Sequence, residues 1–236
     1  MELRNGGAVR ILTLAAVGLL VIGARGADNP LEAVFQRMDA AAAKFKGMTA
    51  DMKRLSHEGA LGEEETSTGT IVVKAMKPRD VRMLLDFKGE DAKTVEVSGT
   101  KADIYFPKAA EIQEYDFGKS NRTLVEQFLK LGFGSTSREM VEAYTVDYGG
   151  KEKLDGQDTA RLVLIPKSKD VAAQFPKFEL WISNNLGIAI QQKLYQPGGS
   201  YNVVTYSNVR INPNISDSDV KFKNLPKGVK TTPVSR

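Results

Sequence analysis

The side chains of this sequence that could perform catalysis are few and scattered. Its 236 residues include one histidine and no cysteine, which excludes disulfides, thiolate nucleophiles, iron–sulfur clusters and multi-histidine metal sites. His57 lies between Ser56 and Glu58, but the Gly-x-Ser-x-Gly turn that presents a nucleophilic serine is missing. Glycine-rich phosphate loops and dinucleotide-binding fingerprints are also missing. We therefore expect a protein that is not an enzyme and has no cofactor. We place His57 at a strand end and interpret it as an exposed histidine without a catalytic role.

Two groups of carboxylates have spacings that occur at metal sites. Glu63, Glu64 and Glu65 form a run that we place in a hairpin loop, and Asp217 and Asp219 stand two apart, as calcium ligands can. The further ligands and the central glycine of an EF-hand loop do not follow the aspartate pair. We interpret both groups as solvated and expect no metal site.

The first 26 residues have the pattern of a secretory signal peptide. Two arginines precede an apolar run, Ile11–Ile22, which spans about 18 Å as a helix and is too short for a hydrocarbon core of about 30 Å. Small residues follow near Gly26, where we expect cleavage. An uncleaved membrane anchor is the alternative. Residues 27–236 are then expected to form one exported domain.

The charge balance argues against a nucleic-acid partner. Loss of the first 26 residues removes three arginines and one glutamate, which lowers the formal net charge from +4 to +2. Across the whole chain, 42% of residues are hydrophobic and 26% are charged, a composition typical of globular proteins. A nearly neutral domain offers no basic surface for nucleic acid.

An amphipathic helix is expected to open the domain. Asp28 or Asn29 can cap it, Pro30 suits the first helical position, and Gly47 marks the end. The apolar residues between these limits follow helical spacing; they are Leu31, Val34, Phe35, Met38, Ala42 and Phe45.

From Thr49 onward the apolar residues recur with a period of two, which predicts strands. Short turns rich in Gly, Asn and Asp separate them, so neighbouring strands should pair antiparallel. A helical insert between Ser120 and Val141 interrupts the series of about 11 strands. The clearest runs are Thr66–Met76, Asp80–Lys88, Thr94–Val97, Ala102–Phe106, Glu111–Asp116, Ala143–Tyr148, Thr159–Pro166, Lys177–Ser183, Ile188–Tyr195 and Tyr201–Ile211.

The alternation gives the predicted sheet one apolar and one polar face. In the run from Phe178 to Ser183, for example, Leu180 and Ile182 share a side with Phe178, and Glu179 and Trp181 lie on the solvated side. So many strands have more apolar face than a few short helices can cover. The fold class is therefore α+β, and the sheet either curls into a barrel or leaves an apolar groove. An ordinary packed core is the alternative.

Several short strings, in their order along the chain, resemble the LolA family of periplasmic carriers for outer-membrane lipoproteins. The resemblance extends from about Pro30 to Val229, and the preceding signal peptide and the opening helix make it more specific. The strings are Thr68–Lys74 followed by Lys77-Pro78, Phe178–Ile182 followed by Asn185–Gly187, Tyr206–Asn212, and Val220–Phe222 followed by Leu225–Val229.

The resemblance implies a strongly curved antiparallel half-barrel with the opening helix and the insert as a lid over an apolar cavity. It further implies a monomeric periplasmic carrier that receives acyl chains of lipoproteins, or of other lipids, from an inner-membrane release complex and delivers them to an outer-membrane acceptor. A lipid- or lipoprotein-sensing regulatory module on the same scaffold is the alternative. The family's turn arginine has no counterpart, and Lys77 is the candidate to latch the lid, as a point charge instead of a planar fork.

Strand parity and the family pattern together give the candidate site. The acyl-chain cavity is predicted from Ile71, Val73, Met83, Leu85, Phe87, Leu162, Leu164, Phe178, Leu180, Ile182, Val204 and Tyr206, and the lid from Leu124, Phe128 and Leu131.

Overall fold

The computed structural model describes residues 29–77, 80–118 and 131–234. The predicted signal peptide and the predicted lid residues Leu124 and Phe128 lie outside these ranges. Among the helices that are described, none is long and apolar enough to span a membrane.

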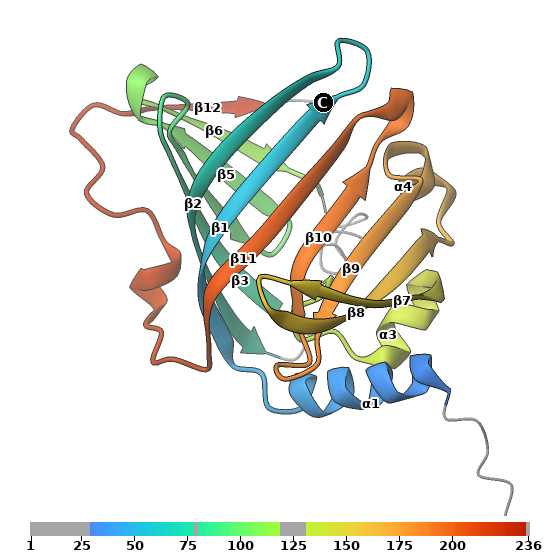
Figure 1. The fold of residues 1–236 in the computed structure, drawn as a ribbon. Helices are drawn as coiled ribbons and strands as arrows, with labels where there is room; N and C mark the ends of the chain where they lie inside the picture. The colour runs from blue at the N-terminus through green and yellow to red at the C-terminus, as the bar shows by residue number, and fades with distance from the viewer. Residues whose placement is uncertain (1–28, 78–79, 119–130, 235–236) are drawn as a thin grey trace, which may run out of the picture.

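The described residues form one strongly curved, open sheet of twelve strands (Figure 1). Its spatial order is β12-β6-β5-β4-β3-β2-β1-β11-β10-β9-β8-β7, so most neighbours in space are also neighbours in sequence. The strands are β1 (Gly47–Glu58), β2 (Glu63–Lys77), β3 (Asp80–Lys88), β4 (Lys93–Ser98), β5 (Lys101–Phe106), β6 (Glu111–Asp116), β7 (Tyr144–Leu154), β8 (Gln157–Pro166), β9 (Lys177–Ser183), β10 (Ala189–Tyr195), β11 (Tyr201–Ile211) and β12 (Lys230–Val234).

Few helices accompany this sheet. The described ones are α1 (Pro30–Ala42), α3 (Ser137–Ala143) and α4 (Lys169–Gln174), with short 3-10 turns η1 (Pro107–Ala109), η3 (Pro197–Gly199) and η4 (Asp217–Val220). The predicted α+β half-barrel is thus confirmed. The ten runs named from the sequence correspond to β2 to β11, and the sheet has twelve strands because β1 and β12 add to them. β12 pairs parallel to β6 at the edge, and the other strand pairs are antiparallel as expected.

Near the first hairpin one prediction is confirmed and one is wrong. His57 lies at the end of β1, opposite Glu64 on β2, and it is half-buried because its ring stacks on Tyr201 with the centroids 4.6 Å apart. The carboxylates from Glu63 to Glu65 belong to β2 instead of a loop. Polar residues fit these strand ends because the first residues of β2 are exposed to solvent, and the cross-strand ring contact favours extended backbone at His57.

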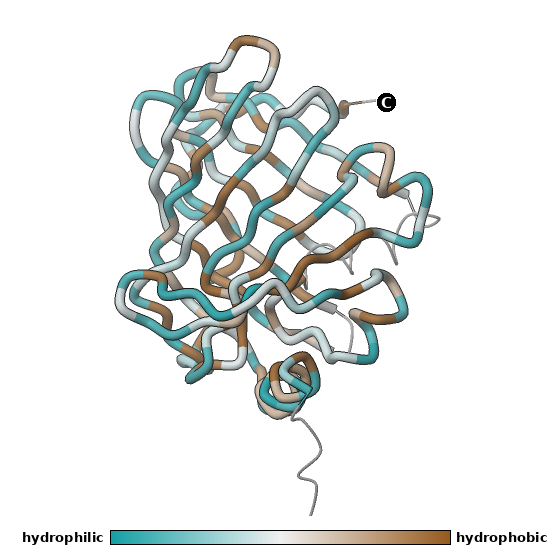
Figure 2. The backbone as a smooth tube through the Cα atoms, turned by 45° about the vertical axis from the view of Figure 1, so that its right-hand side comes forward, coloured by the Kyte–Doolittle hydropathy of each residue, from teal (hydrophilic) through white to brown (hydrophobic). Residues whose placement is uncertain are grey.

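Helix α1 lies across one end of the sheet (Figures 1 and 2). The Asn29 side chain accepts a hydrogen bond from the amide of Leu31 at 3.1 Å and so caps the helix as predicted. Val34 and Met38 are buried. Figure 2 shows hydrophobic and hydrophilic residues interleaved along the strands above the helix, as expected for a sheet with two different faces.

Helix α3 begins at Ser137, within the described part of the predicted helical insert. The Thr136 hydroxyl accepts from the amide of Glu139 at 3.2 Å, and the Glu139 carboxylate accepts from the amide of Thr136 at 3.0 Å. This reciprocal capping box satisfies backbone donors that a helix start leaves unpaired. A second link joins the helices, because the Asp39 carboxylate on α1 accepts from both the amide and the hydroxyl of Ser137.

The chain after β11 crosses one face of the sheet, the face opposite to the one that carries Val73 and Val97. Lys74 on β2 forms an ion pair with Asp217 at 2.6 Å, Val220 is fully buried, and the amide of Phe222 donates to the Glu96 carboxylate on β4 at 3.0 Å. Asp217 therefore takes part in an ion pair instead of being simply solvated. These contacts lead the chain from the middle of the sheet to its far edge, where β12 pairs with β6 (Figure 1).

A substitution at Gly187 can test how closely α1 packs on the turn between β9 and β10. It has φ +67°, and a Cβ there would lie 2.6 Å from the Arg37 carbonyl oxygen. Gly156 has φ +78° with nothing within 4 Å, so Gly156→Ala should cost only about 1 kcal/mol of backbone strain. Gly187→Ala adds a clash with helix backbone, and we expect a loss of about 3 kcal/mol or more in the free energy of unfolding.

Urea unfolding of the two variants measures the difference. Equal losses for Gly187→Ala and Gly156→Ala would contradict the close packing of α1 on this turn.

Candidate functional site

All twelve sheet residues predicted for the cavity belong to, or pack against, two apolar clusters. We call the sheet face that carries both clusters the inner face. Ten of the twelve are buried, and Leu85 and Val204 are half-buried. The structure thus confirms that the alternation predicts which side chains share a face, whereas their contact with acyl chains remains a prediction.

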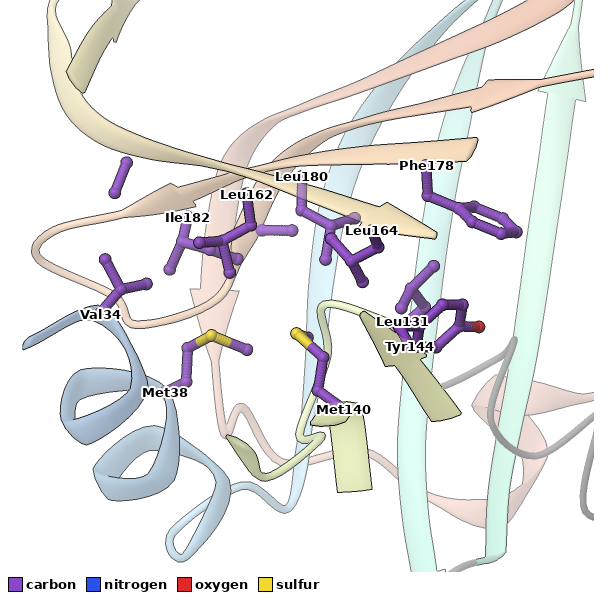
Figure 3. Packing of buried hydrophobic residues seen from close by; sticks show 12 residues of the cluster. Val34, Met38, Leu131, Met140, Tyr144, Leu162, Leu164, Phe178, Leu180 and Ile182 are labelled. Atoms are coloured by element: carbon purple, nitrogen blue, oxygen red, sulfur yellow. The ribbon is translucent and has the colours of Figure 1, made fainter. Parts of the chain in front are cut away.

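The first cluster lies between β8, β9 and the helices (Figure 3). Phe178, Leu180 and Ile182 on β9 are fully buried. Ile182 lies toward Val34 and Met38 of α1, and Phe178 lies at the other end of the cluster beside Tyr144. Tyr144 packs edge-on against Phe178 with ring centroids 5.6 Å apart, and burial raises the pKa of Tyr144 to about 12. Because this phenol stays neutral at physiological pH, it acts as part of an apolar wall.

The second cluster lies on β1 to β4 and β11. Its buried members include Met48, Ile71 and Met83, and Phe133 packs edge-on against Tyr206 with ring centroids 5.0 Å apart. Burial also raises the pKa of Tyr206. The two clusters therefore give the inner face an apolar lining across most of the sheet.

The segment Leu131–Phe133 joins the two clusters. Leu131 belongs to the first and Phe133 to the second. The Gln192 side chain on β10 donates to the Leu131 carbonyl at 2.6 Å, and the amide of Ala189 donates to the Gly132 carbonyl at 2.9 Å. Leu131, the predicted lid residue within the described ranges, is thus buried and fixed to β10.

Burial on the inner face decreases along the strands away from α1. On β1 the inner residues run from Met48, Ala50 and Met52, all buried, to Arg54, which is half-buried. The residues opposite them on β2 also become more polar and less buried, from Val73 and Ile71 to Ser67, which lies opposite Arg54. The inner face is therefore apolar at the end that α1 covers and polar toward the other end.

A pocket of about 350 Å³ lies at the polar end. Arg54 and Lys93 line it, and each places its charged group over the Phe87 ring, at 5.7 and 5.8 Å from the centroid. Sequence reasoning missed both cations. The signal was available for Arg54, since it stands two residues after Met52 in the alternation and so shares its face.

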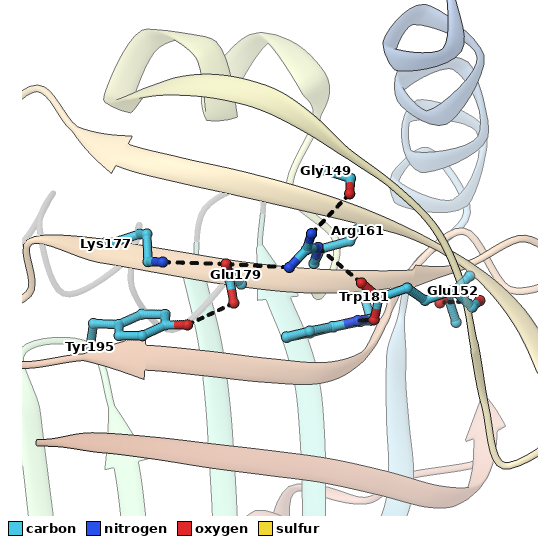
Figure 4. Close-up of polar contacts among 8 residues, drawn as sticks. Gly149, Glu152, Arg161, Lys177, Glu179, Trp181 and Tyr195 are labelled. Carbon is cyan, nitrogen blue, oxygen red and sulfur yellow. Dashed lines mark hydrogen bonds and ion pairs between the residues drawn. The ribbon is translucent and has the colours of Figure 1, made fainter.

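The opposite, outer face of β9 is also buried, which corrects the prediction of a solvated side. Glu179 and Trp181 are each 6% exposed. The Trp181 indole donates to the Glu152 carboxylate at 2.6 Å, and Glu179 accepts from the Tyr195 hydroxyl at 2.9 Å and pairs with Arg161 at 3.7 Å (Figure 4). Long side chains of the neighbouring strands reach across β9 to bond with Glu179 and Trp181. Their hydrocarbon stems thereby cover the outer face of β9.

The remaining residues singled out in the sequence lie outside the two apolar clusters. Lys77, the latch candidate, ends β2 with its backbone paired to Asp80, and its latching role remains a prediction. Asp219 pairs with Lys223 at 2.8 Å, which together with the Ser216 hydroxyl and amide holds the pKa of that carboxyl below its usual range. Within the described ranges, no group of three or more His, Asp or Glu side chains could hold a metal ion.

Comparison with known proteins finds a likeness in structure alone. No family model matches the sequence, and no curated protein matches it. An uncharacterized conserved protein from Thermus thermophilus superposes with a TM-score of 0.54 at 10% identity, over 87% of this chain and 99% of that one.

Two further structures belong to named proteins. MucB superposes with a TM-score of 0.50 at 13% identity, over 82% of this chain and 63% of its own. A LolA superfamily protein from Nitrosomonas europaea has a TM-score of 0.40 at 9% identity, over 81% of this chain and 97% of its own. At these identities the superpositions on MucB and the Thermus protein show a shared fold.

Proposed function

We propose that this protein binds acyl chains of a lipoprotein or a related lipid on its inner face and carries them through the periplasm toward the outer membrane. The observation that carries the proposal is the extent of the apolar inner lining. It continues beyond the part that α1, α3 and Leu131–Phe133 cover, to half-buried apolar residues; these include Leu85, Val95, Ala102, Leu194 and Val204.

Such a face suits an acyl chain because the attraction requires only area and shape. Burial of each methylene contributes about 0.8 kcal/mol, so a chain of about 14 methylenes would contribute roughly 11 kcal/mol before the costs of association. Uptake and release of the chain need no catalytic group, which agrees with an inner face that is mostly hydrocarbon. We therefore propose a carrier without enzymatic activity.

The remaining parts of the proposal follow the resemblance to carriers. Residues 1–26 would direct export, and an inner-membrane release complex and an outer-membrane acceptor would load and unload a monomer. Lys77, Leu124, Phe128 and Leu131 would form and latch a lid whose packing competes with the chain for the same surface. Leu131 already occupies that surface beside Phe178 and Leu180, which supports competition of this kind.

Native mass spectrometry of the protein purified from its own periplasm tests the carrier function. We expect a bound species with one or more acyl chains, identified after solvent extraction. Transfer of that species to acceptor membranes would separate a carrier from a lipid-sensing regulatory module, because only a carrier must release its lipid. Protein that is consistently free of lipid, with or without added lipid, would contradict the proposal.

Val204 and Val203 give a matched pair for the inner face. They are neighbours on β11 and both are half-buried, but Val204 packs against the second cluster while Val203 lies on the opposite face. A charge at Val204 would have to be desolvated by a bound chain. We expect Val204→Asp to lower the affinity for a fluorescent fatty-acyl probe at least tenfold and Val203→Asp to leave it within about twofold.

Equal affinities in the two folded variants would show that the chain does not bind this face. Circular dichroism and thermal unfolding confirm that each variant is folded before binding is compared.

A further inference from the structure

We propose that the pocket around Arg54 and Lys93 binds the phosphate of a phospholipid head group whose acyl chains lie on the inner face. This inference rests on the proposed function and narrows its cargo. The lipid anchor of a lipoprotein is an uncharged diacylglycerol thioether, so a site for phosphate favours a glycerophospholipid. Four observations support the assignment.

The first is the position of Arg54 on the inner face. It follows Met48, Ala50 and Met52 on β1 and lies opposite Val204 on β11. A chain that lay along the apolar part of β1 would therefore end beside this guanidinium. The inner face has the same order as a lipid, with the hydrocarbon first and the polar group at the end.

The second is the lack of a partner for the charge. The Nε of Arg54 is buried without a hydrogen-bond partner. Among the described residues Arg54 and Lys93 have no ion pair, and both charged groups lie over the Phe87 ring. By contrast, Lys74 and Arg161 on the outer face both pair with carboxylates. Unpaired donors in a partly buried site are the arrangement expected where a ligand supplies the acceptor.

The third is the continuity between the pocket and the apolar clusters. Phe87 belongs to the second cluster and is 7% exposed, yet its ring also lies under both cations. Gly69 lies opposite Phe87 on β2, and it lets the backbones of β2 and β3 approach closely here, since a Cβ at Gly69 would lie 2.2 Å from the Asp86 carbonyl oxygen. One aromatic ring thus joins the surface for a chain to the site for a head group.

The fourth is the distribution of charge within the pocket. Arg54 and Lys93 are half-buried, whereas Glu65, Glu90 and Asp91 line the pocket and are exposed. The exposed Lys88 also lines the rim, but its ammonium is paired with Asp86. Carboxylates at the rim oppose a freely diffusing anion but favour a phosphate that carries an ammonium group on its outer side. Phosphatidylethanolamine has this order of charges and is therefore the probe of choice.

The experiment compares two lipids that share their acyl chains, dioleoylphosphatidylethanolamine and dioleoylglycerol, by competition in native mass spectrometry. The protein should prefer the phospholipid. Arg54→Gln should lower the affinity for the phospholipid about tenfold, the worth of one charged hydrogen bond, and leave dioleoylglycerol binding unchanged. Lys53→Gln is the control, because it makes the same change in net charge at the neighbouring residue, which is exposed on the outer face.

The outcomes separate this inference from the proposed function. If neither lipid binds, both fail. If both lipids bind equally to the wild type and to Arg54→Gln, or if Arg54→Gln weakens both to the same degree, the acyl site stands and the phosphate site is overturned. Competition by inorganic phosphate alone at the same concentration as the phospholipid would also overturn the head-group assignment. Lys93→Gln gives an independent reading of the same site should Arg54→Gln fail to fold.

Discussion

The constraint on which the rest of this structure depends is the burial of one apolar face of an open, curved sheet. A closed barrel would bury that face within itself, but twelve strands with two free edges cannot do so. The described elements that pack on the inner side cover part of this apolar face. Helix α1 supplies Val34 and Met38, α3 supplies Met140, and the segment Leu131–Phe133 fills the space between the two clusters. What these elements leave half-buried becomes the candidate binding surface.

The outer face is stabilised differently, mainly by polar and ionic contacts between neighbouring strands. Around β9 these contacts form a network in which Glu179, almost fully buried, is satisfied by the Tyr195 hydroxyl, Lys177 and Arg161. Over β2 to β4 the chain after β11 provides the cover, and it ends in β12 along the edge. Pro233 within β12 suits an edge strand, since a proline cannot donate to a further strand and so discourages pairing with another molecule.

The inner face changes in character along its strands. Its lining is hydrocarbon from α1 to the middle of the sheet, and it becomes charged at Arg54 and Lys93. A surface of this kind distinguishes ligands by the length of their apolar part and the charge of their polar end. Such a gradient suits the proposed binding and release of a lipid.

Short-range interactions fix the local features of this protein, and these can be recognised in the sequence. The cap at Asn29, the capping box from Thr136 to Glu139 and the face shared by Phe178, Leu180 and Ile182 all follow from interactions within a few residues, and each is observed. The tertiary structure alone decided which distant segments meet. The parallel pairing of β12 with β6, the burial of Trp181 by Glu152, and the contact of Arg54 and Lys93 with one Phe87 ring join residues far apart in the chain. A period of two tells which side chains share a face, but the curvature of the sheet and the order of its strands determine what each face encounters, and those arise only when the whole sheet packs.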